Sequence, residues 1–367
     1  MRSLFFCIIV FLVFSPHMAY ADGTAIQGDA PSWAERVILL LTNEARCDPV
    51  ATLKDCKNCA EKSCYKKPLP PTTWSHELAR AARFHSTNLS SAKCFDHNSP
   101  CQLREDISTL YPDPCDGSVE CACVGEVKCN AGTNTFKRIS YFGQSGSGEN
   151  IAMGNSDPKR SFMQWYWEKS ESSTCGFSME NGHRYSILNP ENVKVGVGVV
   201  GTMNTQDFGR GTAQSGFSSG IHYPNAAGMV EFKTHYYSAE QELKVAALNW
   251  EGECKSMKRS LGTKQNGVYS VSFDVQATCV PYYFQGISQD GSAIRYPAKG
   301  RLLFNCEDRI WEDETLATCD IEGGSATSGS GDACSYTPAS SSKQNLALLV
   351  LAILATFALR RRRAMVK

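Results

Sequence analysis

The chain has 367 residues, of which 42% are hydrophobic, so it can bury two modest cores rather than one large one. Lys and Arg together number 37, as do Asp and Glu, so the overall charge gives no indication of a nucleic-acid partner. Seventeen cysteines indicate a disulfide framework formed in an oxidising compartment.

Residues 1–21 have the pattern of a signal peptide. Arg2 precedes an apolar run from Leu4 to Phe14, and Ala19-Tyr20-Ala21 fits the small-x-small rule of signal peptidase. We therefore expect cleavage before Asp22 and export of the chain. The apolar run is too short to span a bilayer, which disfavours a retained N-terminal anchor.

Ser32 begins the first predicted helix. Ser32 and Glu35 have the spacing of a capping box, in which each side chain accepts a hydrogen bond from the other residue's backbone N–H, and the helix should extend to about Arg46. Residues 47–71 then form an insertion that contains cysteines and lysines. The spacing Cys56-x2-Cys59-x4-Cys64 also permits a zinc site, although an exported chain favours disulfides.

A second helix is predicted from Trp74 to Leu89. Four of its side chains follow at steps of four, three and four, which is one face of an α-helix: Leu78, Ala82, His85 and Leu89. Because His85 lies on this apolar stripe, we interpret it as a packed, hydrogen-bonded core histidine rather than a cleft residue.

The segment from residue 98 to 147 contains five cysteines, and its Pro, Gly and Asp content argues against regular structure. We expect a disulfide-held excursion, with Cys121-x-Cys123 as a second pair that zinc could use. Further on, Asp157-Pro158 predicts a helix start, because an N-cap acceptor precedes proline at the first helical position. The alternation of Val with Lys or Gly over 193–199 predicts a strand with one valine face on the core.

Chemistry-bearing residues are concentrated between Gly148 and Pro190. This stretch contains G-E-N-I-A at 148–152, W-Y-W-E at 165–168 and G-H-R at 182–184, and it is preceded by C-F-D-H-N-S at 94–99. These motifs resemble, in order, those of the CAP superfamily of cysteine-rich secretory, antigen 5 and pathogenesis-related 1 proteins, bacterial members included. The resemblance covers roughly residues 32–201. It implies an α+β fold, an α-β-α sandwich with a central antiparallel sheet.

The resemblance also implies a cleft where His97, Glu149, Glu168 and His183 converge. In such a tetrad, His97 and His183 are candidate ligands for zinc or another divalent cation, while each carboxylate holds a ring nitrogen. Without metal, a carboxylate beside an imidazole raises its pKa, which suits an acid–base pair or an anion site. A satisfied polar cluster that only orders the cleft is the third alternative.

The C-terminal part of the chain has a different pattern. We expect a CAP-type domain at 30–202, a linker at 203–222 rich in Gly, Ser and Thr, and a small all-β, sandwich-like domain at 223–320. Its strands are indicated by alternation at 230–236 and 269–275 and by a short candidate at 301–306. Four cysteines could form two bridges there: Cys254, Cys279, Cys306 and Cys319.

The end of the chain has the features of a surface tail. A stalk rich in Gly and Ser at 321–343 precedes residues 344–367, where an apolar run from Leu346 to Leu359 is followed by arginines at 360–363. Together with Cys334, this arrangement resembles the bacterial MYXO-CTERM sorting tails. An ordinary C-terminal membrane anchor is the alternative.

Sequence patterns favour binding over catalysis. No Ser or Cys lies in a nucleophile-elbow motif, and Ser147 fits turn chemistry. We expect an exported protein of the cell surface or extracellular space, whose cleft binds a lipid, a metal, a small molecule or a protein partner. A metal-dependent hydrolase of an extracellular or envelope polymer is one alternative, and a structural or adhesion protein is another.

Overall fold

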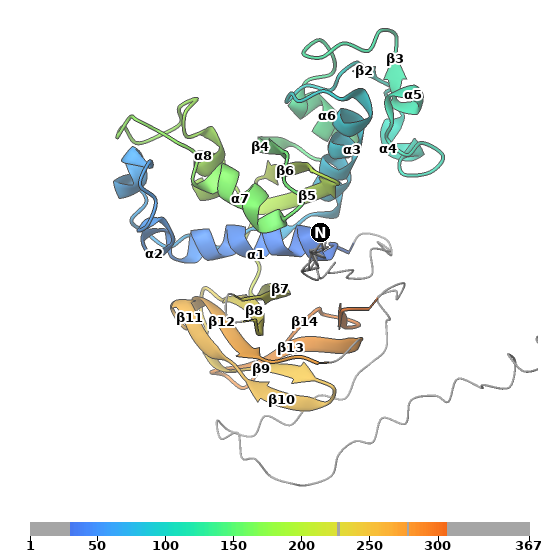
Figure 1. Cartoon of the computed structure of the whole chain (residues 1–367). Coiled ribbons are helices and arrows are strands. Elements are labelled where there is room, and N and C mark those ends of the chain that lie inside the picture. Colours follow the sequence, from blue (N-terminus) through green and yellow to red (C-terminus); the bar gives the residue numbers. More distant parts are fainter. Residues whose placement is uncertain (1–29, 226–227, 277–278, 307–367) are drawn as a thin grey trace, which may run out of the picture. The chain divides into compact units, whose positions relative to one another are not determined.

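The computed structural model describes residues 30–225, 228–276 and 279–306 (Figure 1). The predicted signal peptide at 1–21, stalk at 321–343 and tail at 344–367 lie outside the described residues. Across the described ranges, helices are either too short or too polar to cross a bilayer. All described residues belong to one compact unit, Met1–Ala326.

Helices, one four-stranded sheet and one two-stranded sheet make up the described part that ends at Gly209 (Figure 1). The helices are α1 Trp33–Cys47, α2 Pro49–Leu53, the 3-10 helix η1 Ala60–Cys64, α3 His76–Ala92, α4 Ile107–Leu110, α5 Val119–Ala122, α6 Thr135–Tyr141, α7 Pro158–Tyr166 and α8 Gly182–Leu188. The predicted capping box is confirmed, since the Ser32 side chain accepts from Glu35 N and Ser32 N donates to Glu35 Oε2 at 2.8 Å. Asp157 caps α7, with proline at its first turn, as predicted.

The first sheet has the strand order β1-β5-β6-β4, with β4 at one edge. Its strands are β1 Thr73–Trp74, β4 Gly146–Met153, β5 Lys194–Val200 and β6 Met203–Gly209. Neighbouring strands β5, β6 and β4 are antiparallel, while the two-residue β1 pairs with β5 in parallel. Mixed helices and antiparallel sheets confirm the α+β class.

Two glycines of β5 let helix α3 lie directly on the sheet. A Cβ atom at Gly196 would lie 2.0 Å from Ala79 N, and one at Gly198 would lie 2.2 Å from Arg83 N. Only glycine fits at these positions, because the obstacle is helix backbone that cannot turn aside. Val195 and Val197 point to the opposite face and pack with buried side chains of α1, α7 and α8, so the predicted valine face is confirmed.

Residues 203–222 are not the linker that we expected. They form β6 and most of β7 Gly216–Pro224, so the connection between the sheets shortens to residues 210–215. Strand β6 is polar, yet all seven of its residues are buried. Its side chains hydrogen-bond to neighbouring helices: Ser86 Oγ donates to Thr205 Oγ1, and Gln206 Nε2 donates to Thr42 Oγ1. Burial through hydrogen bonds leaves no apolar alternation, which is why the pattern suggested a linker.

Two antiparallel sheets follow, and the strands predicted near 230–236, 269–275 and 301–306 are confirmed as β8, β12 and β15. One sheet contains β7, β8 Val230–Tyr237, β11 Lys258–Gly262 and β12 Asn266–Phe273. The other contains β9 Leu243–Trp250, β10 Glu253–Ser256, β13 Val280–Ser288, β14 Ala293–Tyr296 and β15 Leu302–Phe304. Both sheets contribute to one buried cluster in which Phe232, Trp250, Tyr282 and Phe304 are in ring contact.

The cysteines form bridges rather than zinc sites. Six disulfides join described residues: Cys56–Cys59, Cys64–Cys175, Cys94–Cys129, Cys101–Cys123, Cys115–Cys121 and Cys279–Cys306. Both cysteine groups that permitted zinc by spacing are therefore cross-linked, and that alternative is wrong. In the described part of the chain, Cys47 is a free, buried thiol.

The excursion at 98–147 is more regular than its composition indicated. It contains α4, α5, α6 and a short ladder between β2 Gln102–Leu103 and β3 Cys123–Val124. It also has a buried cluster with Leu78 and Phe84 of α3. Three disulfides hold this segment together. Its helices and strands can therefore form without the hydrophobic periodicity that normally predicts them.

A chain of buried hydrogen bonds connects α1 with the sheet that contains β7, β8 and β12. Asn43 Nδ2 donates to Ser218 Oγ at 3.0 Å, Ser218 Oγ lies 2.8 Å from His235 Nδ1, and His235 Nε2 lies 2.9 Å from Asn266 Oδ1. Asn266 Nδ2 in turn donates to Leu69 O at 2.9 Å. Since Asn266 Oδ1 can only accept, His235 donates from Nε2 and accepts from Ser218 at Nδ1. Burial keeps this imidazole neutral by lowering its pKa to about 4.

Replacing His235 with Gln should make the free energy of unfolding depend less strongly on pH below pH 6.5. Between pH 6.5 and about 4, the unfolded chain binds a proton at His235 that the folded chain does not, so the free energy of unfolding falls as the pH falls. Without His235, this slope should decrease by about 1.4 kcal/mol per pH unit. Urea denaturation at pH 6.5 and 4.5 measures it, with His76→Gln, an exposed histidine, as the matched control. Equal slopes in H235Q and the unmodified protein would contradict the neutral state of His235.

Candidate functional site

His97 and Glu149 form the first pair of the predicted tetrad. His97 Nδ1 lies 2.8 Å from Glu149 Oε1, and because an ionised carboxylate only accepts, the imidazole donates from Nδ1. The His97 side chain is 52% exposed, whereas that of Glu149 is 2% exposed. The ring therefore reaches solvent, while the carboxylate that orients it does not.

Arg138 of α6 contacts both residues of this pair. Its fully buried guanidinium makes an ion pair with Glu149 Oε2 and donates to His97 O at 2.9 Å. Burial by itself would raise the pKa of Glu149, but the Arg138 charge and the His97 hydrogen bond lower it to about 2. The hydrogen bond to Glu149 in turn raises the pKa of His97.

Sequence reasoning missed Arg138 because it lies in the segment that we expected to lack regular structure. A signal was available: Asn134 caps α6 by accepting from Lys137 N. An asparagine before a short run with Phe136 and Ile139 would have predicted a helix, and Arg138 would then lie on it.

His85 is the core histidine that the helical stripe predicted. It is fully buried, its Nε2 lies 3.1 Å from Asp96 O, and it lies 4.0 Å from Glu149 Oε2. Burial and the nearby Arg138 charge lower the pKa of His85 to about 3, so the ring is neutral and donates from Nε2. Since Asp96 precedes His97, this bond also holds the loop that carries His97.

Asp207 is a second buried carboxyl beside Glu149. The two residues are direct partners in the β4–β6 ladder, so their side chains lie on the same face of the sheet. Asp207 is fully buried, and burial together with the Glu149 charge raises its pKa well above its usual range. Two adjacent buried carboxyls do not both ionise. Glu149 has Arg138 as its counterion, so Asp207 keeps the proton.

Replacing Asp207 with Asn should stabilise the protein at neutral pH. Folding forces Asp207 to take up a proton that it lacks in the unfolded chain above pH 3.8, so wild-type stability is lost as the pH rises toward the raised folded-state pKa. Asparagine removes this penalty. The advantage of D207N over wild type should shrink by about 1.4 kcal/mol per pH unit as the pH falls toward 4. Urea denaturation at pH 7, 5 and 4 measures it, and a D207N protein less stable than wild type at pH 7 would contradict the assignment.

His183 and Glu168 form the second pair. His183, in the first turn of α8, lies with Nδ1 2.6 Å from Glu168 Oε2. The other carboxylate oxygen, Oε1, accepts from Arg184 N at 2.8 Å. The side chain of His183 is 34% exposed and that of Glu168 is 12% exposed. As in the first pair, the carboxylate occupies Nδ1 and leaves Nε2 as the remaining ring position.

Strand β4 connects the two pairs. Glu149 contacts His97, and the next residue, Asn150, donates from Nδ2 to His183 O at 3.3 Å. Strand β4 therefore contacts the side chain of His97 through Glu149 and the backbone of His183 through Asn150. The structure thus pairs each predicted histidine with one of the two predicted glutamates.

In residues 30–225, 228–276 and 279–306, the tetrad is not among the groups of side chains whose metal-ligand atoms lie close together. The set whose ligand atoms lie within 4.8 Å of one another is Cys115, Asp116 and Cys121, and its cysteines are joined by a disulfide. The donor chemistry of the tetrad nevertheless fits zinc, because each imidazole is oriented at Nδ1 by a carboxylate. His97 and His183 are the residues that would hold a divalent cation, one nitrogen each.

An open groove of about 590 Å³ lies at the start of β4. It is lined by Phe136, residues 143–147 and Arg210, and none of the four tetrad residues contributes to it. Ser147, at its end, donates to Asn192 Oδ1 at 2.6 Å. An amide oxygen is no general base, so this contact fits the predicted turn role of Ser147.

Residues 123–212 match the model of the cysteine-rich secretory protein family, CAP. The chain contains a CAP domain. The matched segment includes Glu149, Glu168 and His183, whereas His97 lies before it. Within the CAP domain, the matched residues therefore supply three of the four side chains in the two His–Glu pairs.

Among solved structures, the chain is similar to an extracellular protein containing an SCP domain from Bacillus anthracis str. Ames, determined at 1.5 Å resolution. The two are 22% identical with a TM-score of 0.29, and the alignment covers 48% of this chain and 40% of that chain. This chain thus spans less than half the length of that protein. No curated protein matches the chain.

Proposed function

We propose that the CAP domain binds an extracellular ligand between the His97–Glu149 and His183–Glu168 pairs. The observation that carries this proposal is the shared geometry of the pairs. In each, a largely buried carboxylate fixes Nδ1 of a solvent-reachable imidazole, at 2.8 Å and 2.6 Å. Two oriented rings beside one edge strand suit recognition of a polar group.

The charge of the site limits the ligand to two chemical classes. A raised pKa favours the protonated ring of His97, which suits an acidic group of a lipid, small molecule or protein partner. With both rings neutral, their Nε2 atoms suit a divalent metal such as zinc. Binding is supported over hydrolysis because Ser147 contacts an amide and the described disulfides consume most of the nearby thiols.

The finer organisation of the protein is part of the same proposal. We propose an α-β-α sandwich around the first sheet, and a β-sandwich formed by the two later sheets. Six disulfides support an oxidising, extracellular setting. Export by residues 1–21 and surface retention through a bacterial-type sorting tail at 344–367 complete the proposed arrangement.

Zinc titration tests the site directly. The purified protein should bind zinc by calorimetry, and the double variant His97→Ala/His183→Ala should bind it at least about tenfold more weakly. The two substitutions remove rings that reach solvent, so unfolding in urea should change little. His76→Ala, which removes an exposed histidine elsewhere, serves as the control. Unchanged affinity in the double variant would remove His97 and His183 from the site.

A further inference from the structure

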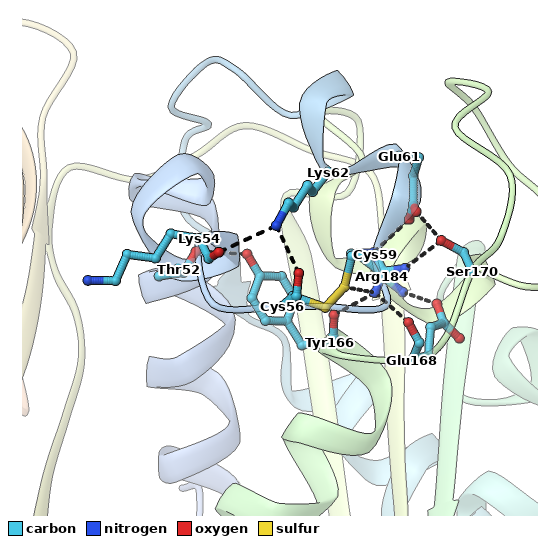
Figure 2. Close-up of a disulfide and its surroundings, with 10 residues drawn as sticks. All are labelled: Thr52, Lys54, Cys56, Cys59, Glu61, Lys62, Tyr166, Glu168, Ser170 and Arg184. Atoms are coloured by element: carbon cyan, nitrogen blue, oxygen red, sulfur yellow. Dashed lines mark hydrogen bonds and ion pairs between the residues drawn. A yellow bond between two sulfur atoms is a disulfide. The ribbon is translucent and has the colours of Figure 1, made fainter.

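The guanidinium of Arg184 is fully buried and lies next to Glu168, the carboxylate of the second His–Glu pair (Figure 2). Its Nη1 donates to Tyr166 O at 2.8 Å and to Glu168 O at 2.9 Å. Its backbone N–H donates to Glu168 Oε1 at 2.8 Å. One residue therefore fixes both the backbone and the carboxylate of Glu168, and Glu168 fixes the ring of His183.

Glu61 neutralises this buried cation. Its Oε1 accepts from Arg184 Nε at 2.7 Å, and its Oε2 contacts Ser170 Oγ. Both side chains of the Glu61–Arg184 ion pair are 0% exposed. Burial opposes ionisation of Glu61, but the hydrogen bonds from Ser170 and Arg184 outweigh it and lower the Glu61 pKa. Removing one partner of such a pair leaves an uncompensated charge in the interior.

The insertion at 47–71 supplies Glu61 and is joined by backbone hydrogen bonds to the loop after α7. Ser170 N donates to Asn58 O at 2.8 Å, and Ala60 N donates to Ser170 O at 3.3 Å. The Cys56–Cys59 bridge closes the turn before Glu61, and Cys59 Sγ accepts from Arg184 Nη1 at 3.0 Å (Figure 2). The cross-link between Cys64 and Cys175 then fastens the insertion to the loop that leads into α8.

We propose that Glu61 is a positioning residue for the His183 half of the site and acts through Arg184 on Glu168. The inference rests on the proposed function and assigns a role to the insertion. It contrasts with the first pair, where Arg138 of α6 contacts Glu149 directly. The two halves are thus backed by different arginines from different segments. A change at Glu61 should alter His183 and leave His97 as it is.

Ring-nitrogen NMR of the full protein tests this without any ligand. Glu61→Gln keeps the shape of the side chain and removes its charge, while Ser170→Ala removes one hydrogen bond from the same carboxylate and is the milder variant. In wild type, His183 should carry its proton on Nδ1. In both variants the 15N shifts of His183 should move toward a mixture of tautomers, and those of His97 should not. Lys57→Gln, an exposed change in the same insertion, is the matched control.

Calorimetry with zinc alone gives the second measurement. Binding should weaken by about tenfold in E61Q, with a smaller loss in S170A and none in K57Q. Wild-type ring shifts in both E61Q and S170A would overturn the positioning role. So would equal shifts of His97 and His183, because that result would indicate general loosening. If wild type binds no zinc while the His183 shifts still move selectively, the positioning role stands and only the metal-binding form of the proposed function fails.

Discussion

Buried guanidinium groups hold the loops on which the site depends. Arg46, Arg138 and Arg184 are all fully buried, and each donates to backbone carbonyls of loops or of the last residues of helices. The acceptors are Pro70, Ile187 and Asn189 for Arg46, His97 for Arg138, and Tyr166 and Glu168 for Arg184. Buried loop carbonyls need donors that no neighbouring strand supplies, and a rigid fork of five N–H groups supplies them. The sheet provides the platform, and Arg138 and Arg184 hydrogen-bond to the backbones of His97 and Glu168 in the two pairs.

Two kinds of acceptor compensate these buried arginines for the water that they lose on folding. Arg138 and Arg184 each contact a buried carboxylate, Glu149 and Glu61. Arg46 is instead surrounded by carbonyl oxygens, and burial lowers its pKa to about 9. Uncharged acceptors can therefore hold a buried arginine here, while the two arginines near the site are neutralised. The charge of Arg138 lowers the pKa of Glu149, which stays ionised and able to orient the His97 imidazole.

Much of the scaffold could be predicted from sequence because it depends on local patterns. The capping box of α1, the apolar stripe that contains His85 and the valine face of β5 all follow from spacing. The two histidines and their glutamates came from motif resemblance, and the structure gives their pairing. Arg138, Asp207 and Glu61 were missed for a shared reason. Each is a fully buried ionisable residue whose charged neighbour comes from another element, and apolar periodicity does not indicate such burial.

The cross-links in residues 30–209 lie mostly between loops rather than between the first sheet and its helices. Cys56–Cys59, Cys64–Cys175 and Cys115–Cys121 each stiffen surface segments that have few apolar side chains. Covalent bonds hold the shape of these segments, so their exposed residues are not needed for packing. Substitutions at exposed positions of these cross-linked segments can therefore change the surface chemistry while the folded interior stays the same.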